Sequence, residues 1–508
     1  MKTKKLYSIV VVGLLTLFIF GGCTEDFEEI NTNRTKLTEL DQSTLGPAFA
    51  NAQWRTFSAY QIFQNLFSDL YAQYFTTITP NFPSDRHVQV GRWIDASYRV
   101  FSTDPVPSIL EVIEKTAENG DDVGNAVARV WKVHMFHRIT DYFGPIPYFE
   151  LGSSESSVPY DDQQTIYMDF FNELDAAIAV LESNPGGSAF GTNDLIYGGD
   201  AGQWLKFANS LRLRLALRIS GVDAAKARTE AEKAVASGVM LTNGDNAFLA
   251  VNDASFNQLN QITAWNEFRM SANMESLLKG YNDPRISAYF APTVDNPNEY
   301  EGARNGLKQS DLALPENKAN TLSNMADIFL PPSQGINPQT VMYSAESYFL
   351  RAEGALNGWN MDGTAEDLYN MGIRLSLEQW GTPEDDIQPY IDGTSLPVAT
   401  GDFVNTPPLT DIPVLYDPAN ALEQIHTQKW LALYPNGWEA WAEMRRTGFP
   451  RQYPRISSDN PDAPADQIVR RMRFVDGEYI NNARAMDGAV EKLGGPDKEL
   501  TRLWWDPN

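Results

Sequence analysis

Apolar side chains recur every three or four positions through long stretches of the chain, which is the spacing of one buried helix face. In residues 167–184 the apolar members of this series are Phe170, Leu174, Ile178 and Leu181. Acidic residues occupy the opposite face of the same segment. Residues 124–148 show the same period and then a helix stop at Gly144 and Pro145. The two segments are therefore predicted to pack as an antiparallel helix pair.

Two further helix pairs follow the same pattern. Asp200 is placed to cap one helix, and Asp223 to cap an alanine-rich helix that ends near Gly238. A third pair runs through residues 341–357 and 364–380. Pairs of about 34 residues with small side chains at the crossings are typical of tetratricopeptide repeats. The predicted fold class is mainly α, with tetratricopeptide-like helix pairs as the scaffold.

Two long stretches, residues 239–335 and 382–420, interrupt the helical period and are rich in Asn, Asp, Gly and Pro. They are predicted to be loop insertions with little regular structure. No Ser/Gly-rich linker divides the chain, so residues 41–508 are predicted to form a single domain. Long ordered loops on a rigid scaffold commonly carry function, and a ligand site is expected there.

The only cysteine of the 508 residues, Cys23, stands between an apolar run and an acidic one. A single thiol closes no internal disulfide and supplies no paired-cysteine metal or redox site. Upstream, three lysines, an apolar run at 9–20 and two glycines have the three-part layout of an export signal. The apolar run is shorter than the roughly 20 residues that span a bilayer, which argues against a transmembrane helix. Residues 1–22 are therefore predicted to be a signal peptide.

The small pair before Cys23 resembles the lipobox of bacterial lipoproteins, although Phe20 stands where leucine is usual. The resemblance implies cleavage before Cys23 and acylation of that residue, and an ordinary signal peptide with an incidental cysteine is the alternative. Residues 23–40 are polar and acidic and are predicted to be a flexible tether. The acids directly after the cysteine resemble the surface-export signal of Bacteroidetes lipoproteins.

Recognisable catalytic and metal-binding motifs are scarce in the sequence. The net charge of −26 disfavours binding to nucleic acid. His134 and His137 lie three apart on one predicted helix, but no HExxH motif or third ligand accompanies them, so a structural role is expected. No G-x-S-x-G motif or phosphate-binding glycine loop occurs, and no cofactor is expected. A surface hydrolase that uses two of the 66 acidic residues stays open as a remote alternative.

Three charged or aromatic motifs are predicted to be architectural rather than functional. One is the leucine-interleaved arginine series of residues 204–220, which comprises Arg212, Arg214 and Arg218 and predicts a helix with salt-bridged flanks. Another is the aromatic set around the turn at 435–437, which comprises Trp430, Trp438 and Trp441. The third is the turn Asp283-Pro284-Arg285, whose ion pair would contribute little if it were exposed.

Six motifs, in this order along the chain, resemble the SusD/RagB family, the surface lipoproteins that help Bacteroidetes take up nutrients. They are DYFGPIPY (141–148), PYDDQQTIYMDFFNELDAAI (159–178), WLKFANSLRLRLALRIS (204–220), SYFLRAEGALNGW (347–359), KWLALYPNGWEAWAEMRRTGFP (429–450) and WWD (504–506). The resemblance runs from Cys23 to the C-terminus.

The resemblance implies a non-enzymatic protein that a lipid anchors to the extracellular face of the outer membrane. Such proteins capture an oligosaccharide and form a lid over a partner SusC-like TonB-dependent transporter, which imports the glycan. A minority, which are RagB-like, capture peptides instead, and an oligopeptide is the alternative ligand for this chain. Binding of either kind requires no cofactor.

Ligand sites of this family lie on loops that match residues 79–91 and 256–305. The candidate ligand contacts are Phe82, Arg86, Trp265, Tyr300 and Trp93. Sugar rings have apolar C–H faces bordered by hydroxyls, so one or two aromatic planes ringed by polar side chains are expected. Each candidate has a structural alternative: Trp265 could plug the insertion, Tyr300 could be solvated, and Trp93 could pack inward.

Overall fold

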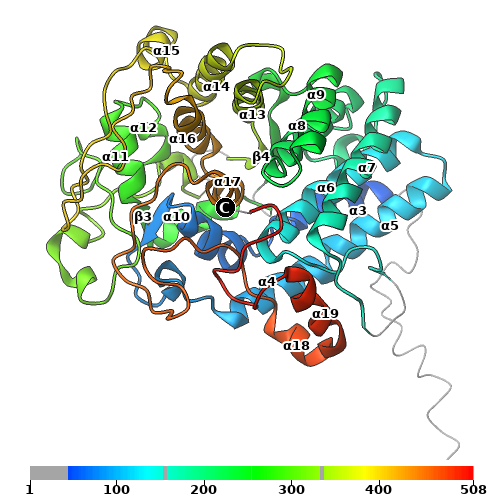
Figure 1. Ribbon diagram of the computed structural model, residues 1–508, viewed down its shortest axis with the longest axis horizontal. Coiled ribbons are helices and arrows are strands. Elements are labelled where there is room, and N and C mark those ends of the chain that lie inside the picture. Colours follow the sequence, from blue (N-terminus) through cyan, green and yellow to red (C-terminus); the bar gives the residue numbers. More distant parts are fainter. Residues whose placement is uncertain (1–43, 153–156, 253–254, 332–336, 507–508) are drawn as a thin grey trace, which may run out of the picture. The chain divides into compact units, whose positions relative to one another are not determined.

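The helix pairs predicted from the apolar spacing form the scaffold of the computed structural model (Figure 1). The structure describes residues 44–152, 157–252, 255–331 and 337–506. The predicted signal peptide, the lipidation site Cys23 and the tether at 23–40 lie outside the described residues. Residues 45–508 form a compact unit of their own, and this unit carries all the elements described below.

The first predicted pair is confirmed by α6 (Asp122–Phe143) and α7 (Gln163–Ser183), which pack against each other. Each helix begins after an aspartate, because the side chains of Asp121 and Asp162 accept hydrogen bonds from backbone N–H groups of the first turn. α6 ends where the sequence predicted, since Gly144 takes a φ of 83° that other residues rarely adopt.

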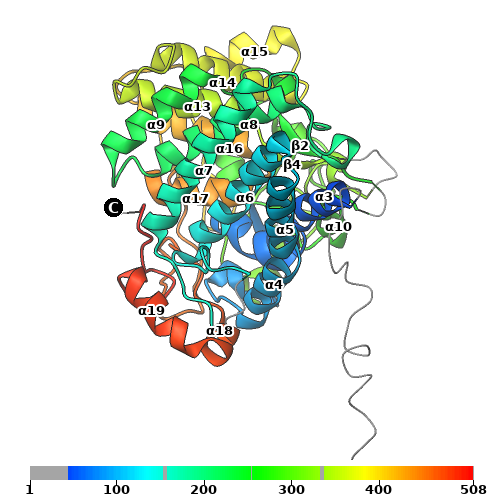
Figure 2. The same cartoon turned by 90° about the vertical axis from the view of Figure 1, so that its right-hand side faces the viewer.

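The second predicted pair is confirmed by α8 (Ala201–Arg218) and α9 (Ala224–Ser237). Asp200 and Asp223 cap the two helices as expected, each accepting a hydrogen bond of 3.0 Å from a backbone N–H group of the first turn. α8 also lies against α7, so the two pairs join into one layer, whose helices lie next to one another in Figure 2.

The third pair consists of α13 (Ser344–Leu356) and α14 (Ala365–Gln379). Its first helix begins later than residue 341, because Val341 belongs to strand β4 (Gln339–Met342). β4 pairs antiparallel with β2 (Ala247–Leu249). Because of this pairing, residues 339–342 form a strand, although the apolar spacing predicted a helix from residue 341. α13 packs on α8 and connects the third pair to the second.

The described residues also form further α-helices and one π-helix. They are α3 (Leu45–Arg55), the π-helix η1 (Gln61–Asp69), α4 (Gly91–Thr103), α5 (Pro105–Glu118), α10 (Gln258–Trp265), α11 (Ala272–Gly280), α12 (Ile286–Tyr289), α15 (Glu384–Ile391), α16 (Ala421–Leu433), α17 (Gly437–Thr447), α18 (Asp476–Asn481) and α19 (Ala483–Leu493). None of the helices within the described ranges has the length and apolar character needed to cross a bilayer.

The two insertions have an irregular course over much of their length, but they also contain short elements that their composition did not predict. α10 and α11 form because the side chains of Asn257 and Ser271 cap them. Strand β3 (Phe268–Met270) forms because it pairs antiparallel with β1 (Phe75–Thr77), far earlier in the chain. These short elements give the first insertion a fixed frame.

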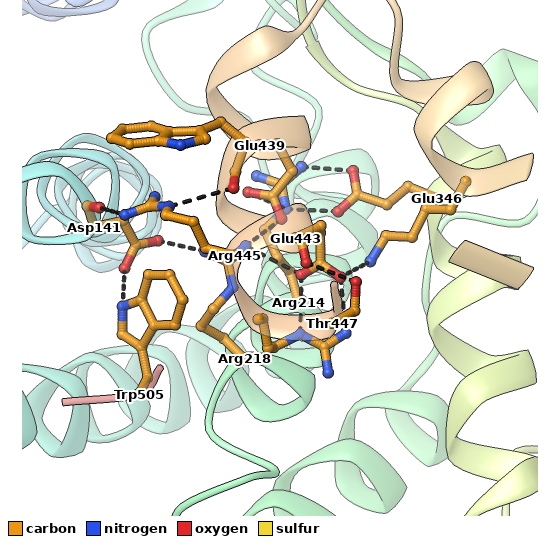
Figure 3. A network of polar contacts seen from close by, with 12 residues as sticks. Asp141, Arg214, Arg218, Glu346, Glu439, Glu443, Arg445, Thr447 and Trp505 are labelled. Carbon is orange, nitrogen blue, oxygen red and sulfur yellow. Dashed lines mark hydrogen bonds and ion pairs between the residues drawn. The ribbon is translucent and has the colours of Figure 1, made fainter. Parts of the chain in front are cut away.

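Arginines of α8 point into the core, where carboxylates neutralise them (Figure 3). Arg214 donates two hydrogen bonds of 2.7 Å to Glu346, and Arg218 lies 2.8 Å from Asp141. Arg218 also contacts Glu439 on α17, and all five side chains belong to residues less than 5 % exposed. The predicted salt-bridged helix is therefore confirmed, and its ion pairs tie α8 to three other elements of the core.

The aromatic motifs also lie in the core, as predicted. Trp430, Trp438 and Trp441 are all buried, and each indole N–H donates to a backbone carbonyl oxygen. The turn pair Asp283 and Arg285 is fully buried at 2.6 Å, so the ion pair is not of the exposed kind. These contacts assign the tryptophans and the turn pair to the architecture of the molecule.

Candidate ligand-binding surface

The β1–β3 ribbon brings together the two loops in which ligand contacts were predicted. Thr77 pairs with Phe268, and the chain continues from there into residues 79–91 on one side. The carbonyl oxygen of Glu267 accepts hydrogen bonds of 3.0 Å from the Ile78 N–H group and the Thr77 hydroxyl. The ribbon itself is buried, and it brings together the ends of two loops that are distant in sequence.

Phe82 and Trp93 lie next to each other beside this ribbon. The Phe82 ring stacks on Phe268 with a centroid distance of 5.6 Å and an interplanar angle of 8°. Its other neighbour is Trp93, whose ring lies 6.2 Å away at 70°. Both candidates are half-buried, so each ring has a face or edge in the core and part of its surface in solvent.

Trp265 is the most exposed aromatic candidate, with 42 % of its surface accessible. It is the last residue of α10, and the chain reverses at Asn266, which takes a φ of 62°. The buried guanidinium of Arg269 holds this turn by donating to the Asn266 side-chain oxygen at 2.8 Å and to its carbonyl oxygen at 3.2 Å. The exposed indole therefore stands on a fixed turn.

Arg86 is located in the same loop as Phe82, but its guanidinium bonds to other groups of the protein. The residue is 8 % exposed, and its Nε donates to Asp459 at 2.6 Å. The Nη atoms donate to the carbonyl oxygens of Leu307 and Pro80 at 3.2 and 3.1 Å. Arg86 therefore positions the loop that carries Phe82.

Tyr300 lies in another part of the first insertion and is half-buried. Burial raises the pKa of its phenol, so the hydroxyl stays protonated at neutral pH. Among the described residues, no ring contact or hydrogen bond joins Tyr300 to Phe82 or Trp265. The structure brings Phe82 and Trp93 into ring contact beside the ribbon. Among the described residues, Trp265 and Tyr300 make no ring contact with either of them.

Two polar residues of this surface were not among the predicted contacts. Glu267 follows Trp265 by two positions and is half-buried, and this burial raises the pKa of its carboxyl group. Arg92 is exposed, with its guanidinium carbon 5.9 Å from the centre of the Trp93 ring. Both stand within two positions of a predicted aromatic contact, which is the sequence signal that could have identified them.

One group of described residues, Glu353, His426 and Glu443, brings metal-ligand atoms within 4.8 Å of one another. Arg446 donates to both carboxylates at 2.6 to 2.7 Å, and Lys429 lies 2.9 Å from Glu443. Burial lowers the pKa of His426 to about 4, so the ring is neutral. Because two cations already compensate the carboxylates, these residues do not fit a metal ion.

The fold and this surface define a mainly α protein with one exposed indole, half-buried rings and polar groups on irregular, well-framed loops. The chain belongs to the SusD-like family, described as Susd and RagB outer membrane lipoprotein, whose sequence pattern matches residues 25–506. The predicted resemblance and fold class are thereby confirmed.

Solved structures of several relatives share the fold. A chitin-binding SusD homolog from Flavobacterium johnsoniae is 36% identical over 91% of this chain and 99% of its own, with a TM-score of 0.85. A SusD homolog from Bacteroides uniformis is 32% identical over 92% and 100%, with a TM-score of 0.82. A further chitin-binding protein is 27% identical over 91% and 100%, with a TM-score of 0.77. A search of curated proteins gave no match.

Proposed function

We propose that this protein captures oligosaccharides on the cell surface at the β1–β3 ribbon, and that chitin oligosaccharides are its ligands. The observation that carries the proposal is the similarity, over 91% of the chain, to a homolog described as chitin-binding. A second similar structure is described in the same way. The peptide-binding and hydrolase alternatives gain no such support.

The chemistry of the ribbon suits a sugar ligand. An exposed indole such as that of Trp265 can cover the apolar C–H face of a pyranose ring. The carboxylate of Glu267 can accept hydrogen bonds from hydroxyl or acetamide N–H groups at the edge of the ring, and Arg92 can donate to their oxygens. Binding of this kind needs no reacting group, which agrees with a non-catalytic role.

The proposal extends to the place where capture occurs. Acylation of Cys23 would anchor the chain to the outer membrane, and residues 23–40 would tether it on the extracellular side. From there the protein would deliver glycan to a SusC-like TonB-dependent transporter and act as its lid. Family membership and the sequence of the N-terminal segment support this part of the proposal.

Calorimetric titration of residues 24–508 with chitohexaose and cellohexaose tests the proposed ligand. Chitohexaose is expected to bind without being cleaved, and cellohexaose, which lacks the acetamide groups, more weakly. Trp265→Ala should lower the chitohexaose affinity at least about tenfold, as loss of a central aromatic contact does. Phe149→Ala is the matched control, because Phe149 is 48 % exposed and follows α6. Hydrolysis of the ligand, or equal affinities in Trp265→Ala and the parent chain, would contradict the proposal.

A further inference from the structure

A surface groove of about 310 Å³ lies between the end of the 79–91 loop and two segments near the C-terminus. Gln89 lines it from the loop, and residues 459–462 and 497–499 form most of the remaining wall. The β1–β3 ribbon contributes none of the described residues that line it. Gln89 lies four positions before Trp93, so the Cα atoms of the two residues are at most about 14 Å apart. The groove is therefore a near neighbour of the proposed ligand contacts.

Tyr479 of α18 borders this groove. Its hydroxyl donates to Asp497 Oδ2 at 2.9 Å, and Asp497 is part of the wall. The other carboxylate oxygen accepts from the Phe474 N–H group at 3.0 Å and from the buried Arg471 guanidinium, so the carboxylate is fixed. Tyr479 is 42 % exposed, and no aromatic ring or cation of the described residues stacks on its ring. The groove thus has an exposed aromatic plane held at its edge.

The helix that carries Tyr479 lies next to α4, which carries Trp93 (Figures 1 and 2). The two helices approach so closely at their first residues that a side chain in place of Gly91 would collide with the Asp476 carboxylate. Trp93 follows Gly91 by two positions, and Tyr479 follows Asp476 by three. Both rings therefore stand within one helical turn of the contact between α4 and α18.

The carboxylates of the wall already have cationic partners, so a metal ion or another cation would have to compete with them. An uncharged ligand does not disturb these pairs. The pairs are Asp459 with Arg86 at 2.6 Å, Asp462 with Lys498 at 2.8 Å, Glu499 with Arg473 at 3.2 Å, and Asp497 with Arg471.

The paired groups retain capacity for hydrogen bonds to such a ligand. Lys498 has three N–H donors, and Asp462 is its partner among the described side chains. Asp459 accepts from Arg86 through Oδ2, whereas its Oδ1 accepts from no group of the described residues. A sugar hydroxyl can donate to a carboxylate and accept from an ammonium group. A pyranose ring also has an apolar C–H face, which suits the Tyr479 ring.

We propose that this groove is a second sugar-binding subsite, which takes those units of a long chitin oligosaccharide that extend past Trp93. Tyr479 covers the apolar face of one pyranose ring, and Asp459 and Lys498 form hydrogen bonds with the polar groups at its edge. The subsite rests on the proposed function, because it requires a glycan bound at the ribbon. A short oligosaccharide, which occupies the ribbon alone, does not reach it.

Calorimetric titration of residues 24–508 with chitohexaose and chitotriose tests the subsite. Tyr479→Ala should lower the chitohexaose affinity about three- to tenfold, as loss of an aromatic contact does, and leave the chitotriose affinity within about twofold. Tyr479→Phe keeps the ring and should retain most of the chitohexaose affinity. Trp265→Ala should weaken binding of both oligosaccharides. Phe149→Ala is the matched control, because Phe149 is 48 % exposed and lines no part of the groove.

Lys498→Ala gives a second measurement that does not depend on α18. The Lys498 side chain is 50 % exposed, so its removal leaves the fold intact, and the chitohexaose affinity should fall about two- to fivefold. Thermal unfolding midpoints of all variants verify that they are folded. If Tyr479→Ala proves to be unfolded, Lys498→Ala decides the question.

The outcomes separate this subsite from the proposed function. Parent-like chitohexaose affinity in both Tyr479→Ala and Lys498→Ala, with a loss in Trp265→Ala, would exclude the subsite and leave the proposed function intact. Equal losses for the two oligosaccharides in Tyr479→Ala would also exclude it, because Tyr479 would then act on the ribbon site itself. A parent chain that binds neither oligosaccharide would overturn both proposals.

Discussion

The buried charges around α17 and the proposed ligand-binding surface at the β1–β3 ribbon use the same kinds of side chain in opposite ways. In the core, Arg218 lies against Asp141, Glu439 and Glu443, so that each charge is used by the protein itself. At the ribbon, the Trp265 indole is exposed and the Glu267 carboxyl is half-buried. Side chains that the protein does not pair or bury are the ones available to a ligand.

The largest effect is expected from breaking the core network. Arg218→Met should lower the free energy of unfolding by about 3–5 kcal/mol, because it leaves buried carboxylates without their cation. Arg228→Met is the matched control on a surface pair with Glu232, where a change of at most about 1 kcal/mol is expected. Urea denaturation of the two variants measures the difference. Equal losses of unfolding free energy would show that the core ion pairs stabilise the protein no more than the surface pair does.

A second effect concerns Asp69, a buried carboxyl whose pKa burial raises to about 7. The folded state therefore holds a proton on Asp69 between the unfolded-state pKa near 4 and pH 7, and stability falls as pH rises through this range. From pH 5 to pH 7 the contribution of Asp69 should decrease by about 2–3 kcal/mol. Asp69→Asn, which cannot ionise, should lose this part of the pH dependence.

Urea denaturation at pH 5, 6, 7 and 8 compares the two chains. The Asn variant should gain stability relative to the parent chain as pH rises. A parallel pH dependence of the two curves would show that Asp69 ionises in the folded state at its ordinary pKa.

The scaffold was predictable from the sequence because its determinants are local. The apolar period and the caps Asp200 and Asp223 act within one or two helical turns, so a linear pattern reveals them. The ribbon depends instead on the register between Thr77 and Phe268, which no local pattern encodes. The first insertion was therefore predicted as a region of little regular structure, although β3 lies within it.

The same distinction applies to the candidate site. The aromatic residues could be selected by type and by position in a loop, as for Trp265. The role of Arg86 could not, because its partner Asp459 lies 373 positions later in the chain. Burial of a long charged side chain against a distant partner is a tertiary property. The sequence alone does not distinguish such a buried arginine from an exposed one.

A smaller effect is expected when the charge at the ribbon is changed without changing its shape. Glu267→Gln should weaken chitohexaose binding about three- to tenfold at pH 8, because hydrogen bonds to a charged acceptor are stronger than those to an amide. The raised pKa of Glu267 adds a pH dependence: protonation on acidification should reduce the affinity of the parent chain toward that of the variant. Titration at pH 8 and pH 4.5 measures both. An affinity that is the same in the two chains at pH 8 would remove Glu267 from the site.

The smallest effect should come from Arg86. It lies in a loop proposed to bind ligand, but its guanidinium bonds to other groups of the protein. Arg86→Lys keeps the charge near Asp459 and loses the fixed fork that holds Leu307 and Pro80. If Arg86 only positions Phe82, this substitution should lower the chitohexaose affinity about two- to fivefold and lower the unfolding midpoint. A loss of affinity as large as that in Trp265→Ala, at unchanged stability, would instead mean that Arg86 contacts the ligand directly. Hydrogen bonds within the protein would then not exclude a side chain of this loop from ligand binding.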